Sequence, residues 1–247
     1  YGDHRDLHLS IRRQRQMCIR DRFLLVSLTL TLSLSAFAEV LEVYQWKADP
    51  GKSQQLLNNM VEAAEIHTEL GATVGIYALN VGSQNLVDYV LRFDDNESWG
   101  EYKDKIASSE KFQRFWTKVS RNPTGELQMS LTGLNLDAST KAADFPGPFV
   151  YGVWVWDPSP GYEAQLLQNF ARAAEIHESL GARAEAYGEG FGGTGKYHYV
   201  LFFDNWTEMG KFFNKASQSA ELAEFNASVE PGGATLVNSF SGSTLSN

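Results

Sequence analysis

The chain has 247 residues, with 21 basic and 30 acidic side chains and a formal net charge of −9 at pH 7. Residues 1–38 hold six arginines and three aspartates, so the remainder has 15 basic and 27 acidic residues and a net charge of about −12. Such an acidic chain is repelled by nucleic acid and anionic membranes, and we expect neither as a partner. The single cysteine, Cys18, lies in the first segment, which excludes disulfide, thiol and Cys-ligated metal chemistry beyond it.

The N-terminal segment has the pattern of an export signal. An apolar run over 23–34 precedes Ala-Phe-Ala at 36–38, the small-x-small pattern that signal peptidase requires. The run is shorter than the ~20 residues of a membrane-spanning helix, although an uncleaved anchor is the alternative. We predict a signal peptide over 23–38, cleavage near Ala38, and a periplasmic or secreted mature protein that has no membrane contact.

Residues 16–22 resemble the translation of a transposase adapter used to prepare sequencing libraries. We therefore interpret residues 1–22 as an adapter artefact from a metagenomic source or, alternatively, as the basic n-region of the signal. In either case this segment is set aside when the fold is predicted.

The rest of the chain is an internal repeat with an offset of 110 residues. Roughly 27 of about 74 aligned positions are identical, among them Ala-Ala-Glu-Ile-His at 63–67 and 173–177. A repeat of about 100 residues has the size of a domain rather than of a solenoid unit. We predict repeat units over 39–136 and 149–247, joined by a linker over 137–148.

Each unit has the same predicted element order. In the first unit, alternating apolar residues predict strands, and helical spacing predicts a helix from Pro50 to Leu70 and a second helical region over 96–119. The strands are expected over 41–46, 73–81, 86–93 and 126–134. In the second unit, a one-residue deletion moves the last strand to 236–243.

Helix ends are predicted from capping patterns. Asp49-Pro50 and Ser159-Pro160 are expected to supply an N-cap and a first helical residue. Gly71 and Gly181 are expected to end these helices in the left-handed conformation. Asn205 and Glu208 fit a capping box, and Asp94 and Asp204, at the ends of strands, are expected to cap helices.

The order βαββαβ is that of a ferredoxin-like unit, and it occurs twice. In each unit one face of the third strand is apolar and the other is mixed, so the mixed face needs a second sheet to cover it. We predict an α+β fold in which two tandem units pack sheet to sheet into a single-chain α/β barrel. Since both sheets belong to one chain, we expect a monomer or weak dimer.

On this element order, duplication and patterning, the chain resembles the dimeric α/β-barrel superfamily, and within it the antibiotic-biosynthesis-monooxygenase-like domains. The resemblance implies a barrel with helices outside, and an activity among cofactor-independent monooxygenases, lactone isomerases, haem-degrading enzymes, haem peroxidases or proteins without known activity. Haem-degrading members pair a histidine with an asparagine and a tryptophan. Here Trp99 has Met209 as its counterpart and the first strand has no asparagine, so we expect no cofactor, with haem as the alternative.

His67 and His177 are the candidate catalytic residues. Each lies on the apolar stripe of its helix, where a histidine can act as an acid–base catalyst, a hydrogen-bond donor or a haem ligand. The alternative is a buried histidine that bonds a neighbouring strand. Glu65 is two residues from His67 and faces elsewhere, so no metal site is expected.

Aromatic residues repeated between the units are candidates for lining an apolar pocket in each half, although they can also be core residues. These candidates are Tyr44, Trp46, Tyr77, Tyr89, Trp154, Trp156, Tyr187 and Tyr199. The glycine run at 188–193 matches GxGxxG but joins two strands, so we predict a flexible or bulged hairpin instead of a nucleotide site. Three functions stay open: an enzyme, a small-molecule binding protein and a structural protein.

Overall fold

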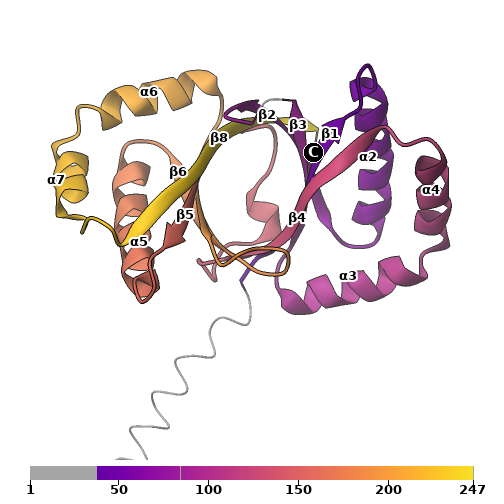
Figure 1. Ribbon diagram of the computed structural model, residues 1–247, viewed down its shortest axis with the longest axis horizontal. Coiled ribbons are helices and arrows are strands. Elements are labelled where there is room, and N and C mark those ends of the chain that lie inside the picture. The colour runs from indigo at the N-terminus through magenta and orange to yellow at the C-terminus, as the bar shows by residue number, and fades with distance from the viewer. Residues whose placement is uncertain (1–37, 84, 247) are drawn as a thin grey trace, which may run out of the picture. The chain divides into compact units, whose positions relative to one another are not determined.

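The computed structural model describes residues 38–83 and 85–246, so the segments interpreted as adapter and signal peptide lie outside this range, apart from Ala38. In the described part of the chain, eight strands close into a barrel in the order β1-β3-β2-β8-β5-β7-β6-β4 (Figure 1). Neighbouring strands are antiparallel throughout. The predicted fold class, two ferredoxin-like units that form a single-chain α/β barrel, is confirmed.

The elements of the two halves correspond one to one. The first half contains β1 Val40–Ala48, α2 Ser53–Glu69, β2 Thr73–Val81, β3 Leu86–Phe93, α3 Asn96–Ser108, α4 Glu110–Arg121 and β4 Gly125–Asn135. The second half contains β5 Val150–Pro158, α5 Glu163–Ser179, β6 Arg183–Glu189, β7 Tyr197–Phe203, α6 Trp206–Ala216, α7 Ala220–Ser228 and β8 Ala234–Ser246. The predicted strands agree with these bounds to within one to three residues.

Two predictions of helix boundaries were wrong. Pro50 does not begin α2, because Gly51 takes a left-handed φ of +76° and the chain turns before the helix starts at Ser53. The second helical region is two helices, because Ser109 adopts an extended conformation and its side chain caps α4 by accepting from the Phe112 amide. In the second half, Ser219 caps α7 in the same way.

The predicted ends of the first helices are confirmed. Gly71 has a φ of +108°, and its amide bonds the carbonyl of Thr68 while the Ala72 amide bonds that of His67. This pair of bonds is the Schellman motif, which satisfies carbonyls at a helix end. The same motif ends α5, so each histidine is held one turn before a fixed C-terminus.

The two faces of each sheet enter different cores. On β3, Tyr89, Leu91 and Phe93 pack under α2, α3 and α4, and the second half repeats this arrangement under α5, α6 and α7. In Figure 1 the two sets of helices lie on opposite sides of the barrel. The alternate face of β3, with Val90 and Arg92, lines the barrel interior.

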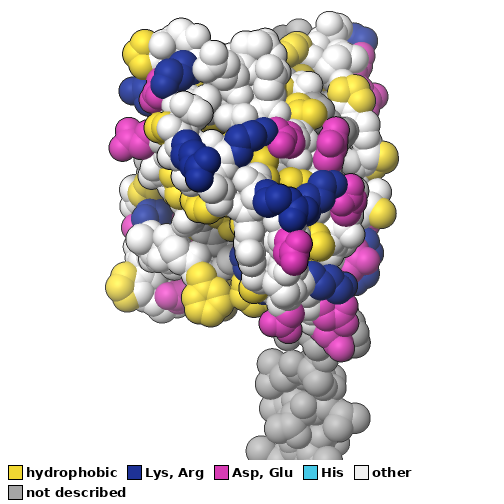
Figure 2. Space-filling model, turned by 90° about the vertical axis from the view of Figure 1, so that its right-hand side faces the viewer, with side chains coloured by type: hydrophobic (Ala, Val, Ile, Leu, Met, Phe, Trp, Pro, Cys, Tyr) yellow, Lys and Arg dark blue, Asp and Glu magenta, His cyan; other side chains and the backbone are white. Residues whose placement is uncertain are grey.

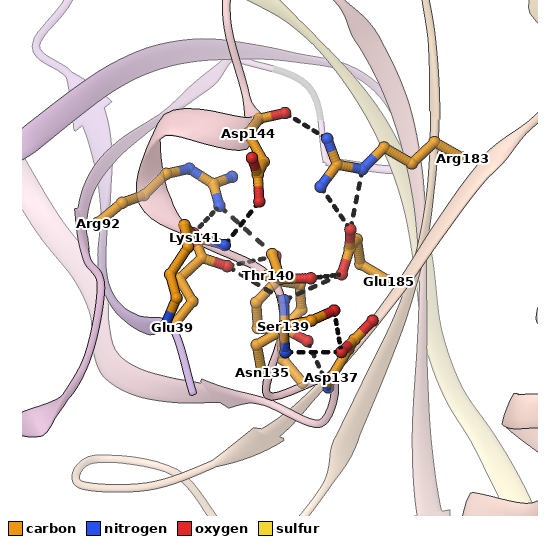
Figure 3. A network of polar contacts seen from close by, with 11 residues as sticks. Glu39, Arg92, Asn135, Asp137, Ser139, Thr140, Lys141, Asp144, Arg183 and Glu185 are labelled. Atoms are coloured by element: carbon orange, nitrogen blue, oxygen red, sulfur yellow. Dashed lines mark hydrogen bonds and ion pairs between the residues drawn. The ribbon is translucent and has the colours of Figure 1, made fainter. Parts of the chain in front are cut away.

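The barrel closes because the last strand of each half pairs with the other half. β8 pairs with β2, and β4 pairs with β6 over only three residue pairs. A buried polar network reinforces this short contact (Figure 3). Glu39 accepts hydrogen bonds from Arg92 at 2.6 Å and from Asn135 and Tyr187 at 3.1 Å each, and Asn135 also donates to Glu185 at 3.0 Å.

The linker covers the end of the barrel at this network. Thr140 donates to Glu185, and Phe145 lies between two guanidinium groups, 3.8 Å from Arg92 and 4.2 Å from Arg183. Asp94 accepts from the amide of Ala142 in the linker, so its predicted role as a helix cap is wrong; the adjacent Asp95 caps α3. In the second half Asn205 caps α6 by accepting from the Glu208 amide.

The surface carries charges of both signs. Figure 2 shows the side on which α4 lies, where basic and acidic side chains alternate. Several of them form ion pairs, such as Lys111 with Glu69 at 2.6 Å. Within residues 38–83 and 85–246, no helix has the length and apolar composition to cross a membrane.

Replacing Arg92 with leucine is expected to destabilise the protein by about 3–5 kcal/mol, because the fully buried Glu39 carboxylate would lose its counter-charge. Urea denaturation measures the loss. The double variant Glu39→Gln/Arg92→Leu removes both charges of this pair and should be more stable than Arg92→Leu alone. Equal stability of the two variants would contradict this role, and Arg114→Leu, in an exposed pair, is a control of little expected effect.

Candidate functional site

A cavity of about 480 Å³ lies in the second half, between the outer face of β5 and β7 and the helices α5, α6 and α7. Its wall is mainly aromatic and aliphatic, with amide side chains and one histidine. The lining includes Trp154, Trp156, Tyr162, Gln165, Phe170, His177, Tyr199, Phe212, Phe213, Leu222, Phe225, Asn226 and Glu230. Protein interiors contain few voids larger than a water molecule, so a space of this size is a candidate binding site.

The polar pair of this cavity consists of His177, which is half-buried, and Tyr199, which is buried. The Nδ1 atom of His177 is 2.9 Å from the hydroxyl oxygen of Tyr199, and the ring of Phe212 contacts the imidazole edge to face. Burial lowers the pKa of His177 and raises that of Tyr199, because each charged form loses hydration. Both groups are therefore uncharged near neutral pH.

The pair can act in two ways, according to the imidazole tautomer. If Tyr199 donates to Nδ1, then Nε2 of His177 carries a proton and is a hydrogen-bond donor. If Nδ1–H donates to Tyr199, Nε2 has a free lone pair and can accept a proton from a ligand hydroxyl. A neutral histidine with a fixed partner is suited to acid–base chemistry or to orienting a polar group.

His67, the equivalent residue in the first half, has a different partner, and neither of the two cavities found among the described residues reaches it. Its Nδ1 is hydrogen-bonded to the hydroxyl of Tyr102, a side chain of α3 that is only 2% exposed. Burial lowers the pKa of His67 to about 4; Glu42 opposes this shift and Lys103 adds to it. Tyr89, the counterpart of Tyr199, has a buried hydroxyl without a hydrogen-bond partner among the described residues.

In the first half, Glu42 closes the space between helix α3 and the sheet. Its carboxylate accepts from Tyr44 at 2.9 Å and from the indole of Trp99 at 2.8 Å, and it pairs with Lys103 at 2.5 Å. These contacts join α3 to β1. The residue equivalent to Glu42 is Gly152, where any side chain would meet the indole of Trp154 at 2.9 Å. The second half therefore lacks this connection between helix and sheet.

The lining on α6 and α7 is also smaller than its counterpart. Three large residues of the first half are replaced by smaller ones in the second: Ile106 by Ala216, Phe112 by Leu222, and Trp116 by Asn226. Three changes act in the opposite direction: Tyr44 becomes Trp154, Met60 becomes Phe170 and Lys103 becomes Phe213. The cavity is present although these three positions carry larger rings.

The two halves also differ in the ion pairs that connect their helices. Lys111 and Lys118 on α4 pair with Glu69 and Glu62 on α2. At the equivalent positions the second half has Glu221 and Ser228 on α7 opposite Ser179 and Arg172 on α5, so neither pair can form. Each exposed pair contributes little, but α7 has fewer attachments than α4.

A second, smaller cavity of about 100 Å³ lies inside the barrel. Tyr77 and Tyr187 line it, together with Asp88 and Arg92. Burial raises the pKa of Asp88 to about 6, although a hydrogen bond from Gln45 opposes the shift. This space is separate from His67 and His177, because Tyr77 and Tyr187 are on the interior face of their strands; its own histidine is His198, paired with Glu189 at 2.8 Å.

The predicted site residues thus fall into three groups. Trp154, Trp156, His177 and Tyr199 meet in the second-half cavity; Tyr77 and Tyr187 line the barrel interior; and Tyr44, Trp46, His67 and Tyr89 pack in or against the core of the first half. Sequence reasoning missed Glu42, Gln165 and Asn169. The amides could have been found, since both halves have the same residues at these positions, Gln55 and Asn59.

The second-half cavity does not suit haem. Its only charged lining residue is the acidic Glu230, so the two carboxylates of haem would find no cation there. Apart from haem, the described residues contain no cluster of three or more His, Cys, Asp or Glu that could hold a metal ion. We therefore derive no chemistry through a haem group.

Acid is expected to weaken folding through His67. Because its pKa is about 4 in the folded protein and near 6.5 when unfolded, the unfolded chain binds more protons between these pH values, and stability falls as pH falls. From pH 7 to pH 5 this contributes a loss of about 2 kcal/mol. Asp88, with its raised pKa, acts in the opposite direction over the same range.

The variant His67→Gln isolates this contribution, since glutamine does not titrate and Asp88 is unchanged. Urea denaturation at pH 7 and pH 5 should show a smaller acid-induced change relative to that of the native sequence. An identical change in both proteins would show that His67 is protonated in the folded state.

Comparisons with known proteins agree with this architecture. The NIPSNAP family model matches residues 41–130, within the first half. Three solved structures share the fold at low sequence identity. A proposed monooxygenase from Fusobacterium nucleatum subsp. nucleatum has a TM-score of 0.56 at 9% identity, over 84% of this chain and 92% of its own.

An anthrone oxidase-like protein has a TM-score of 0.55 at 13% identity, over 86% of this chain and 93% of its own. A proposed chlorite dismutase has a TM-score of 0.55 at 12% identity, over 85% of this chain and 95% of its own. The comparison with curated proteins gives no match. The chain therefore has the fold of the dimeric α/β-barrel superfamily, a closed barrel made of two ferredoxin-like units.

Proposed function

We propose that the second half binds one small, flat, uncharged molecule in the cavity between α5, α6, α7 and the sheet. The observation that carries the proposal is a large cavity with an aromatic wall and a neutral His177–Tyr199 pair. Ligand pockets in proteins have this composition: a mainly apolar wall with a few polar groups that fix orientation.

The cavity lining has almost no charged side chains, which supports an uncharged ligand. No lysine or arginine lines the cavity, and the single charged side chain is Glu230 at its exposed edge. An anion would lose its hydration without gaining a counter-charge. Aromatic rings such as Trp154 and Phe213 instead offer flat surfaces to a ring system.

The proposal assigns one site to each chain rather than one to each half. In the first half the equivalent space is filled by Tyr102, Trp99 and the contacts of Glu42. The first half then has a structural role. The comparison between halves favours the second, since both share the histidine and only the second has the space.

A reaction at the same site is the second candidate function. His177 with a free Nε2 lone pair can act as a general base and take the proton of a phenol or enol. Two of the similar structures are named a proposed monooxygenase and an anthrone oxidase-like protein. The alternative is binding without chemistry, which needs only the wall and the hydrogen bonds.

We also propose that the protein is exported, on the strength of the apolar run and the Ala-Phe-Ala pattern at 36–38, and that it is a monomer or weak dimer. When the chain is expressed in a bacterium behind an initiator methionine, intact mass spectrometry of the periplasmic fraction should give a protein that begins at Glu39. Retention of the whole product in the cytoplasm at full mass would contradict export.

The binding proposal is tested with two probes of matched shape. Beta-naphthol, which is uncharged, should bind and quench the emission of Trp154 and Trp156, while beta-naphthoate at pH 7.5 should bind at least tenfold more weakly, because its charge has no partner in the wall. Native mass spectrometry counts the sites, and one bound molecule per chain is expected. Equal affinities, or no binding of beta-naphthol, would contradict the proposal.

Variants that restore first-half residues should remove the site. The double variant Ala216→Ile/Leu222→Phe fills the cavity, and we expect it to weaken beta-naphthol binding more than tenfold without loss of stability. The matched control is Ile106→Ala/Phe112→Leu in the first half, which should destabilise the fold by a few kcal/mol and leave binding unchanged. Loss of binding in the control alone would place the site in the first half.

A further inference from the structure

The polar residues of α5 that line the cavity lie on one stripe. Asn169, Ala173 and His177 are four residues apart in turn, so they project from the same side of the helix, and all three line the cavity. With a rise of 1.5 Å per residue, Asn169 and His177 are separated by about 12 Å along the axis. The apolar wall thus has a polar group toward each end.

Asn169 is free to bind a ligand, whereas its counterpart is not. In the first half, Asn59 donates to the Thr124 hydroxyl at 3.2 Å. The position equivalent to Thr124 is Gly233, because the Ser159 amide bonds the Gly233 carbonyl as the Asp49 amide bonds that of Thr124. Glycine has no hydroxyl, and among the described residues the Asn169 amide has no hydrogen bond.

An amide beside an aromatic wall needs a partner, since a polar group removed from water without a hydrogen bond is unfavourable. A ligand that fills the cavity excludes water from Asn169 and must replace the lost hydrogen bond. The His177–Tyr199 pair places the same requirement on the opposite end of the ligand.

We propose that Asn169 is a specificity-determining residue that selects elongated, flat ligands with a hydroxyl or carbonyl group at each end. One polar group bonds Asn169 and the other bonds His177, with the ring system between them on the wall. Gln165, one turn before Asn169 on the same stripe, is half-buried and adds a second amide to this end of the cavity. This inference rests on the proposed function, because it concerns the ligand of the same cavity.

The test compares beta-naphthol with the naphthalenediol whose hydroxyl groups lie at opposite ends of the long axis. The native chain should bind the diol about fivefold more tightly, the effect of one additional hydrogen bond. In Asn169→Leu this preference should vanish while the affinity for beta-naphthol stays within about twofold, because its hydroxyl can still reach His177. Isothermal titration calorimetry measures both affinities.

Gly233→Thr provides an independent variant. The new hydroxyl would occupy Asn169 as Thr124 occupies Asn59, and the added Cβ is 3.1 Å from the ring of Tyr162, which can rotate aside. It should also remove the preference for the diol. Asn59→Leu is the matched control: it breaks the bond to Thr124 and should leave both affinities unchanged.

The outcomes separate the two proposals. If neither probe binds, the proposed function fails together with this inference. If both bind the native chain equally well, or the preference survives in Asn169→Leu and Gly233→Thr, the cavity binds ligands but Asn169 does not select them. Loss of the preference in both variants and its persistence in Asn59→Leu is the result we expect.

Discussion

The closure of the barrel is the constraint on which the rest of the structure depends. Neither half can complete its own sheet, because β4 and β8 each pair with a strand of the other half. At the shorter contact, between β4 and β6, Glu39 connects the start of β1 to Arg92 of β3, Asn135 of β4 and Tyr187 of β6. A buried ion pair of this kind is costly to form and costly to break, so its value lies in fixing one arrangement of these strands.

Because the sheets are fixed from within the barrel, the helices outside can change without loss of the fold. The first half uses this freedom to fill its space: Glu42 joins α3 to the sheet, and Tyr102 takes the hydrogen bond of His67. The second half has Gly152 and Phe212 at these positions. The same histidine therefore bonds a helix residue in one half and the strand residue Tyr199 in the other, next to a cavity.

Most of the fold could be predicted from the sequence because its signals are local and occur twice. Strand alternation, the helix-ending glycines and the repeat itself each involve residues close in sequence or at a constant offset. The prediction failed where a single residue overrides the average pattern, as Ser109 does between α3 and α4 and Gly51 before α2. The helical periodicity of apolar residues does not reveal a helix break or a delayed helix start that a single residue causes.

The site was harder to predict because it depends on strand register. Tyr77 and Tyr89 looked equivalent as aromatic residues on neighbouring strands, yet Tyr77 pairs with Asp88 and so faces the barrel interior. One residue of register decides which core a strand side chain enters, and pairing between strands is set by distant residues. Asn169 likewise lacks a hydrogen-bond partner because residue 233 is a glycine. That residue is more than sixty positions away in the sequence and follows a one-residue deletion in the repeat.

The differences between the halves describe a reshaped cavity rather than a poorly packed copy. Loss of packing alone would shrink side chains, as at Ala216 and Leu222, and would leave the remaining positions to vary without pattern. Instead three lining positions gained aromatic area, where Tyr44, Met60 and Lys103 of the first half correspond to Trp154, Phe170 and Phe213. The polar stripe of α5 is meanwhile identical to that of α2 at Gln165, Asn169 and His177. Smaller residues at 216 and 222, larger rings at 154, 170 and 213, and an unchanged polar stripe together give a space that is apolar, flat-sided and able to form hydrogen bonds at both ends.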